Sequence, residues 1–268
     1  MSEVATPFLR ATLGSTGREL HRLGIAASFG VEARAVEAAV EEHGVGYLYW
    51  GSLRRGAFQD AIRALCARGR RDELFVVIQS YSRLASLVRP SLTRALRQLG
   101  IEQADLLLLG WWNGPVWSRV RDAALRCREQ GLTRHLGVST HERPQVPSFA
   151  GADSPFDVVH LRYNAAHRGA ERDVFPHLPA DRAGLVAFTA TCWRKLIRPV
   201  RGAPPDLAVP TAGDCYRFAL QRAELDVCMT GPRHGDDLRA ALATVARGPM
   251  SEDELAWMRR YGDLVYGR

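Results

Sequence analysis

Short apolar segments alternate along the chain with stretches in which apolar residues recur at helical spacing. The run of four leucines at residues 106–109 is typical of these segments, because it is apolar at successive positions rather than at every second one. Continuous apolar runs of this length are expected of strands that are buried on both faces, as in a parallel sheet. The pattern predicts eight such strands, at residues 23–28, 47–50, 74–80, 105–112, 134–140, 156–164, 184–191 and 227–231.

The stretches between these strands predict helices. Periodic patterns cover residues 31–43, 58–68, 90–99, 116–130, 216–223 and 236–247. The interval 142–154 is rich in Pro and Gly, and the interval 173–182 is short, so both are weaker helix candidates. Eight buried strands alternating with about as many helices predict an α/β fold of the (β/α)₈ TIM-barrel type.

Both ends of the chain add an element to the predicted barrel. Residues 8–23 contain "LGSTG", a turn cluster between two short extended stretches, which predicts an N-terminal β-hairpin. Residues 251–261 form an amphipathic pattern that begins with "SEDE", a typical capping sequence, and predict a C-terminal helix outside the barrel. A doubly wound sheet would need a glycine-rich turn after an early strand, and "AASFGVEAR" is not one. No linker divides the chain, so we expect one domain over residues 1–268.

Composition narrows the functional classes. The net charge of +7 could attract phosphate, but the basic residues are spread along the chain, so we expect no nucleic-acid partner. The longest apolar runs are too short to span a bilayer, and no signal peptide is visible at the N-terminus. The five cysteines are scattered without paired spacing, which predicts free thiols, a cytoplasmic location and no metal site. No oligomerisation signal is evident.

Several motifs occur in an order and at spacings that resemble the aldo-keto reductase superfamily. They are "LGSTGRELHRLGIA", "GVGYLYWGS", "SLTRALRQLGIEQADLLLL", "REQGLTRHLGVST", "FDVVHLRYN", "GLVAFTA" and "TGPRHGDDLRAAL", and together they cover nearly the whole chain. The resemblance implies the same (β/α)₈ barrel and carbonyl reduction with NADPH.

The family's catalytic residues are absent at the matching positions. The resemblance implies a tyrosine that donates a proton, a lysine that raises its acidity, an aspartate that pairs with the lysine and a histidine that orients the carbonyl. The residues at these positions are Arg54, Gln79, Tyr49 and Gly110, respectively. Tyr49 is an alternative proton donor if Arg54 lowers its pKa, or it fills the volume left by the lost pair.

The cofactor positions are partly retained. By resemblance, Ser139 would hold the nicotinamide amide, whereas Thr140 and His160 replace an asparagine and a glutamine. Phe188 keeps an aromatic ring where the family stacks one on the nicotinamide. The phosphate region would be formed by Gly231, Arg233 and His234. The resemblance thus implies an NADP(H) site that has lost part of its contacts, or a solvated loop at the last three positions.

The predicted strand ends gather an aromatic and basic set of side chains without a carboxylate. His141 and His160 are acid–base candidates because imidazole titrates near neutral pH, although each could be only a structural hydrogen-bonding group. The predicted substrate contacts are Trp50, Gln79, Trp111, Trp112, Arg162 and Asn164. Such a pocket suits a planar small molecule that carries an anionic or enolic oxygen.

Three functions follow. The first is a repurposed enzyme that performs redox-neutral proton transfer, such as isomerisation, elimination or cyclisation. The second is a non-catalytic binding protein, and the third is an NADPH-dependent oxidoreductase with a different proton donor. Titration with NADPH would separate the third from the other two.

Overall fold

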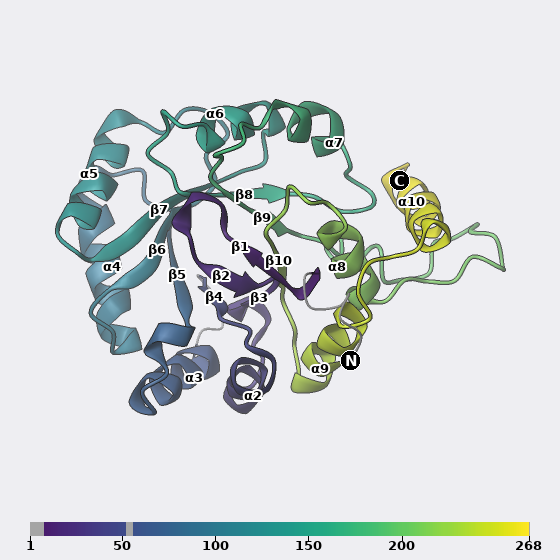
Figure 1. Cartoon of the computed structure of the whole chain (residues 1–268), viewed down its shortest axis with the longest axis horizontal. Helices are drawn as coiled ribbons and strands as arrows, with labels where there is room; N and C mark the ends of the chain where they lie inside the picture. The colour runs from purple at the N-terminus through teal and green to yellow at the C-terminus, as the bar shows by residue number, and fades with distance from the viewer. Residues whose placement is uncertain (1–7, 52–55, 268) are drawn as a thin grey trace.

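The computed structural model describes residues 8–51 and 56–267, and its centre is a closed barrel of eight parallel strands (Figure 1). Pairing runs in chain order and closes between the last strand and the first, so the predicted (β/α)₈ barrel is confirmed. The strands are β3 (Leu23–Ala26), β4 (Tyr47–Trp50), β5 (Phe75–Ser80), β6 (Ala104–Leu109), β7 (Thr133–Thr140), β8 (Val158–Arg162), β9 (Gly184–Phe188) and β10 (Val227–Thr230).

Helices surround the barrel (Figure 1). They are α2 (Ala33–His43), α3 (Gly56–Ala67), α4 (Ala85–Leu99), α5 (Ser118–Glu129), α6 (Val146–Ala150), α7 (Ala170–Asp173), α8 (Ala212–Leu220), α9 (Gly235–Val245) and α10 (Glu252–Tyr266). Short 3₁₀ turns lie at η1 (Gly14–Thr16), η2 (Ala27–Phe29), η3 (Arg71–Glu73), η4 (Arg143–Gln145) and η5 (Phe175–His177). The predicted start of the third helix was wrong, because α4 begins at Ala85 and contains Pro90 instead of opening with it.

The predicted hairpin is confirmed and covers the N-terminal end of the barrel. β1 (Arg10–Thr12) pairs antiparallel with β2 (Glu19–His21), and in Figure 1 the hairpin lies across the barrel. Leu13 and Leu20 are buried with the side chains of the barrel interior. Gly14 has φ +44°, and a Cβ there would overlap the backbone at Gly184, so the hairpin turn packs directly against β9.

The strands have two buried faces with different roles. Residues such as Tyr47, Tyr49, Val77 and Leu108 fill the interior of the barrel. Their neighbours along the strands, for example Leu48, pack under the helices. Because successive side chains of a strand point to opposite faces, this alternation decides which residues near a strand end can reach the barrel mouth.

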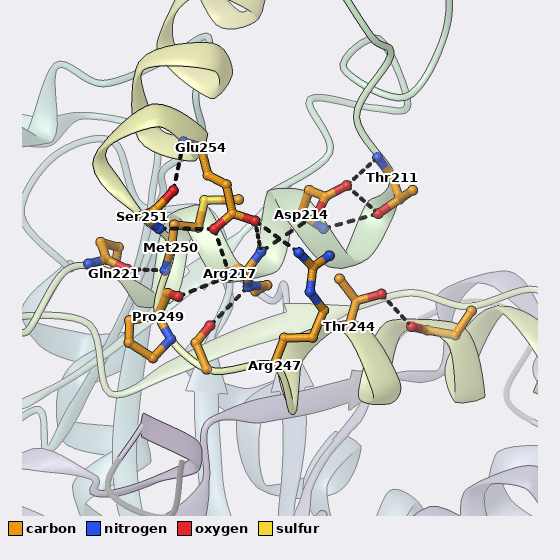
Figure 2. A network of polar contacts seen from close by, with 12 residues as sticks. Thr211, Asp214, Arg217, Gln221, Thr244, Arg247, Pro249, Met250, Ser251 and Glu254 are labelled. Atoms are coloured by element: carbon orange, nitrogen blue, oxygen red, sulfur yellow. Dashed lines mark hydrogen bonds and ion pairs between the residues drawn. The ribbon is translucent and has the colours of Figure 1, made fainter. Parts of the chain in front are cut away.

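A buried arginine anchors the C-terminal helix beside α8 (Figure 2). Arg217 makes a two-pronged ion pair with Glu254 at 2.7 and 2.9 Å and also donates to the carbonyls of Gly248 and Pro249. Hydrogen bonding to Arg217 is the main cause that lowers the pKa of Glu254 to about 2. This network fixes α8, which forms one wall of the cavity described below.

Within residues 8–51 and 56–267, no helix combines the length and the apolar character that crossing a bilayer requires.

Candidate functional site

A cavity of about 880 Å³ opens at the C-terminal ends of the barrel strands, the end at which enzymes of this fold place their active sites. It extends from the barrel mouth to a groove beside α8 and α9, where Gly213, Tyr216, Ala241 and Thr244 line it. Nine of the residues predicted for the site line this cavity: Tyr49, Gln79, Trp111, Ser139, His141, His160, Phe188, Gly231 and Arg233.

A second cavity of about 500 Å³ shares a wall with the first and adds Arg162. Its lining consists of Trp111, Asn113, His141, Arg162, Phe188, Thr189 and Trp193. Register explains the position of Arg162, which lies two residues after the inward-facing His160 and opposite Phe188 on the next strand.

Five predicted residues line neither cavity. Trp50 and Thr140 follow inward-facing residues by one position, so they face the helices rather than the mouth. Trp112 is buried in the outer core and stacks edge-on with Trp117. Asn164 is fully buried and shapes its own turn by accepting from the backbone N–H groups of residues 166 and 167. The fifth, His234, is exposed at the start of α9, and Arg54 lies outside the described residues.

Gly110 is the position that would carry the family's histidine. A Cβ here would overlap the side-chain amide of Gln79 and come within 2.7 Å of the Tyr81 ring. These two side chains therefore occupy the space beside Gly110. The Gln79 Oε1 atom is buried and has no hydrogen-bond partner in the described structure.

Tyr49 and His160 are both held in a neutral state. Burial, with Tyr81 close by, raises the pKa of Tyr49, which is the opposite of the direction that we expected from Arg54. The His160 Nε2 atom lies 2.6 Å from the Tyr47 hydroxyl, and burial lowers the pKa of His160 to about 3. Tyr49 is thus suited to donate a hydrogen bond, and His160 is too weak a base for work at neutral pH.

His141 is the more accessible imidazole. It lines both cavities and contacts two aromatic rings edge-on, with ring centroids 5.9 Å from Trp111 and 5.2 Å from Phe188. Partial burial and the nearby Arg162 charge lower the pKa of His141, while Glu142 opposes the shift. Its imidazole is therefore neutral near pH 7 and able to accept a proton.

Trp111 is held in a left-handed backbone conformation, with φ 63°. Its N–H donates to the Ser139 hydroxyl at 2.8 Å, and Arg83 donates to its carbonyl and to that of Gly110. Ser139, predicted to hold a cofactor amide, thus already accepts a bond from the loop after β6. These bonds hold the backbone of Trp111 in a strained conformation, and the indole ring that it carries is exposed.

The segment after β9 is a second strained region. Thr189 and the three consecutive residues Cys192, Trp193 and Arg194 have φ values between 49° and 71°. Hydrogen bonds from Cys192 N to Thr189 O (2.8 Å) and from Lys195 N to Cys192 O (3.0 Å) close this left-handed turn. The Thr189 hydroxyl is buried and has no partner within the described residues. The strain is concentrated where the chain lines both cavities.

Cys192 is close to a histidine but is not arranged as a nucleophile. Its Sγ lies 3.6 Å from His167 Nδ1, and the Asn164 Oδ1 atom lies 3.2 Å from the same nitrogen. One ring nitrogen cannot both accept from the thiol and donate to the amide. Burial also raises the pKa of Cys192, so we assign its thiol to packing. All five cysteines are free, as predicted.

Carboxylates of the chain occupy the N-terminus of α9, where the resemblance places a cofactor phosphate. The Gly235 N–H donates to Glu32 at 2.7 Å, and the N–H groups of Arg233 and His234 both point to Asp237 at 3.3 Å. These are the backbone donors that would otherwise bind an anion. A phosphate would have to displace one carboxylate and lie beside the other.

Some lining residues were not predicted from the sequence. Tyr81, Thr189 and Trp193 come from loops that follow the strands, and their positions depend on how those loops turn. Phe29, from the loop after β3, packs its ring against Gly231. The alternation of side chains along a strand could have excluded Trp50 and Thr140 from the barrel mouth in advance. No sequence signal indicates the left-handed turn at residues 192–194. Within the described part of the chain, no cluster of three His, Cys, Asp or Glu side chains could hold a metal.

Comparison with known proteins identifies the family. The model of the aldo/keto reductase family matches residues 33–191, more than half of the chain. This chain therefore belongs to the aldo/keto reductase family. No match was found among curated proteins.

Solved structures share the fold. The aldo-keto reductase AKR11C1 from Bacillus halodurans aligns in its apo form with a TM-score of 0.74 and 18% identity, and in its holo form with 0.76 and 17%. Each alignment covers 94% of this chain and 95% of the other. At this identity the likeness establishes the barrel and leaves the reaction to be argued from the site.

Proposed function

We propose that this chain is a small-molecule enzyme that performs redox-neutral proton transfer at the barrel mouth, with His141 as the proton carrier. The observation that carries the proposal is the position of His141. It lines both cavities, it is neutral near pH 7, and hydrogen-bond donors lie in the same lining. A base of this kind can remove a proton beside a carbonyl and return it at another carbon, which is an isomerisation.

The other residues would stabilise the enolate that such a step forms. The Tyr49 hydroxyl, kept protonated by its raised pKa, and the Gln79 amide both line the larger cavity. Neutral donors that are already positioned stabilise developing negative charge without reorganisation. The aromatic walls would bind a planar substrate by stacking.

NADP(H) fits this site poorly. Phe188 retains a stacking surface, but Thr140 lines neither cavity and the Ser139 hydroxyl already accepts a hydrogen bond from the Trp111 N–H. At the phosphate end, Glu32 and Asp237 occupy the backbone donors. We therefore derive no step through a nicotinamide and place the chemistry on the chain's own groups.

The test is deuterium exchange at an activated carbon. The probe is 2-tetralone, a neutral bicyclic ketone, whose exchange in D₂O is followed by NMR without NADPH. The native chain should accelerate exchange, and His141→Gln should lower the acceleration by about 10²-fold or more. His177→Gln, at an exposed histidine outside both cavities, is the matched control. Equal acceleration by the native chain and His141→Gln would contradict the assignment.

The two other functions predict different results. A binding protein would bind 2-tetralone without accelerating its exchange. An oxidoreductase would bind NADPH, measured by fluorescence titration, and would oxidise it when an aldehyde is added; we expect no saturable binding below millimolar NADPH. A cytoplasmic location remains a prediction from the free cysteines.

A further inference from the structure

Among the described residues, the lining of the smaller cavity contains one formally charged side chain and no acid. Arg162 lies among Trp111, Phe188 and Trp193, with His141, Asn113 and Thr189 as the neutral polar groups. Glu142 is not part of this lining, although its charge acts on His141. The lining as a whole is therefore aromatic with a single positive charge.

Arg162 is half-buried and makes no hydrogen bond or ion pair within the described residues. Its guanidinium instead makes a cation–π contact with the Trp193 ring, whose centroid is 5.9 Å from the guanidinium carbon. Two other shielded arginines are paired with carboxylates: Arg182 makes two 2.8 Å bonds to Asp226, and Arg217 makes a two-pronged pair with Glu254. The buried Arg22 has no anion among the described residues either, but it donates to three backbone carbonyls, whereas Arg162 has no such bond. A shielded guanidinium without an anion is costly, so the missing partner points to a ligand.

The Thr189 hydroxyl is a second, independent sign of a ligand. It is buried, lacks a partner, and belongs to a residue that lines the same cavity. Its backbone is strained, with φ 55°. The unsatisfied Thr189 hydroxyl and the free Arg162 guanidinium belong to the lining of one cavity. Together they fit the recognition of one oxygen-bearing group by both residues.

The two tryptophans of this cavity share an unusual backbone conformation. Trp111 and Trp193 both have left-handed backbone and both are more than half exposed, at 59% and 56%. Indole rings held open to solvent by fixed backbone give a large contact area at low entropic cost. They would suit the flat body of the molecule whose charged end meets Arg162.

We propose that the smaller cavity is a subsite for an aromatic carboxylate, whose anionic group binds Arg162 and Thr189 and whose ring lies against Trp111, Phe188 and Trp193. A planar carboxylate matches the planar guanidinium in two parallel hydrogen bonds. One cation balances one negative charge, which favours a carboxylate over a phosphate dianion. The subsite rests on the proposed function only in placing a small molecule at this end of the barrel.

The first experiment compares two ligands on the native chain by calorimetry. The probes are 2-naphthoate and 2-naphthamide, which share a ring system and differ in charge. Charge-assisted hydrogen bonds predict that the acid binds about tenfold or more tightly than the amide. Equal affinities, or no binding of the acid at millimolar concentration, would overturn the proposal. 2-Naphthyl phosphate should bind more weakly than the acid, and tighter binding would overturn the choice of a carboxylate.

The second experiment changes the protein. Arg162→Gln should weaken the binding of 2-naphthoate about tenfold or more and leave the binding of 2-naphthamide unchanged. Arg162→Lys should give an intermediate loss of 2-naphthoate affinity, because lysine keeps the charge but cannot form two parallel hydrogen bonds. Arg201→Gln makes the same change of net charge at an exposed residue outside the cavity and should bind like the native chain. Unchanged 2-naphthoate affinity in Arg162→Gln would overturn the subsite.

The two proposals fail separately. 2-Tetralone carries no carboxylate, so its exchange tests His141 without using Arg162. Selective binding of the acid without any exchange would remove the proposed reaction and keep the subsite. Exchange that depends on His141, together with equal binding of acid and amide, would remove the subsite and keep the proposed reaction.

Discussion

At the N-terminal end of the barrel, Asp105, Asp157 and Asp226 stand at or just before the starts of β6, β8 and β10. Each accepts a hydrogen bond from the backbone N–H of the preceding strand at 2.8–2.9 Å. Each also pairs with at least one arginine. The three aspartates are thus paired and link neighbouring strands, while the buried Nε atoms of Arg18 and Arg22, near this end, lack partners among the described residues.

The C-terminal end has the opposite character. Arg162 lacks an anion, Gln79 Oε1 and the Thr189 hydroxyl lack partners, and the described non-glycine residues with positive φ all lie here. The paired aspartates stabilise the barrel at one end, whereas the mouth holds unpaired polar groups whose contacts a ligand can complete. Four measurements test this contrast.

The largest effect is expected from Asp226→Ala. The substitution leaves Arg182 partly buried without an anion and removes the acceptor of the Leu185 N–H. We expect the free energy of unfolding to fall by about 3–5 kcal/mol, measured by urea denaturation. Asp236→Ala, at a side chain that is 85% exposed, should cost less than about 0.5 kcal/mol. Similar losses in both variants would break the contrast.

The second prediction concerns how stability depends on pH through His160, which is buried inside the barrel. Its pKa is about 3 in the folded chain and about 6.5 when unfolded, so the unfolded chain binds more protons between these values. Stability should therefore fall as the pH is lowered from about 6.5, by up to about 1.4 kcal/mol per pH unit from this group. Buried His21, with a pKa of about 4, acts in the same direction.

The contribution of His160 is isolated by difference. Denaturation of the native chain and of His160→Gln at pH 6.5 and 4.5 should give a flatter dependence in the variant, with His177→Gln as the control for losing one imidazole. Parallel curves would show that His160 is not the titrating group.

Gly110→Ala tests the packing at the C-terminal end. The added methyl group would overlap Gln79 and press against the Tyr81 ring, so one of them must move. We expect a loss of about 1–3 kcal/mol in thermal unfolding. Gly114→Ala, in the same loop with no atom within 4 Å of its Cβ position, should be nearly neutral. Unchanged stability in Gly110→Ala would mean that Gln79 and Tyr81 can move aside at no cost.

The smallest effect is expected from Arg194→Gly. Glycine adopts a φ of 71° without the steric cost that arginine bears, while the unfolded chain gains freedom. The balance should be a gain of about 0.5 kcal/mol. Arg198→Gly, at a residue without positive φ, should destabilise instead. A loss of stability in Arg194→Gly would remove the evidence for strain in this turn.

Much of the fold could be predicted from the sequence. The eight strands lie where the apolar runs place them, because a strand buried on both faces leaves a continuous hydrophobic signature. The hairpin and the capped C-terminal helix were likewise signalled by local turn and capping residues. The predicted start of α4 at Pro90 is wrong, because Pro90 lies inside the helix, which begins at Ala85.

The candidate site was predictable only in part. Residues such as Gln79, His141 and Phe188 were found because strand ends converge in a barrel. Trp50, Trp112 and Asn164 were placed at the mouth from sequence position alone, and they turned out to face the outer core or to form a turn. Tyr81 and Trp193 were missed because loop geometry carries no periodic signal.

The barrel and the family follow from the sequence alone, because burial periodicity and local motifs are properties of consecutive residues. The arginine that lacks a partner and the hydroxyl that is unsatisfied can be identified only in the folded chain. Those properties depend on side chains brought together from distant strands and on backbone strain that the surrounding packing sustains.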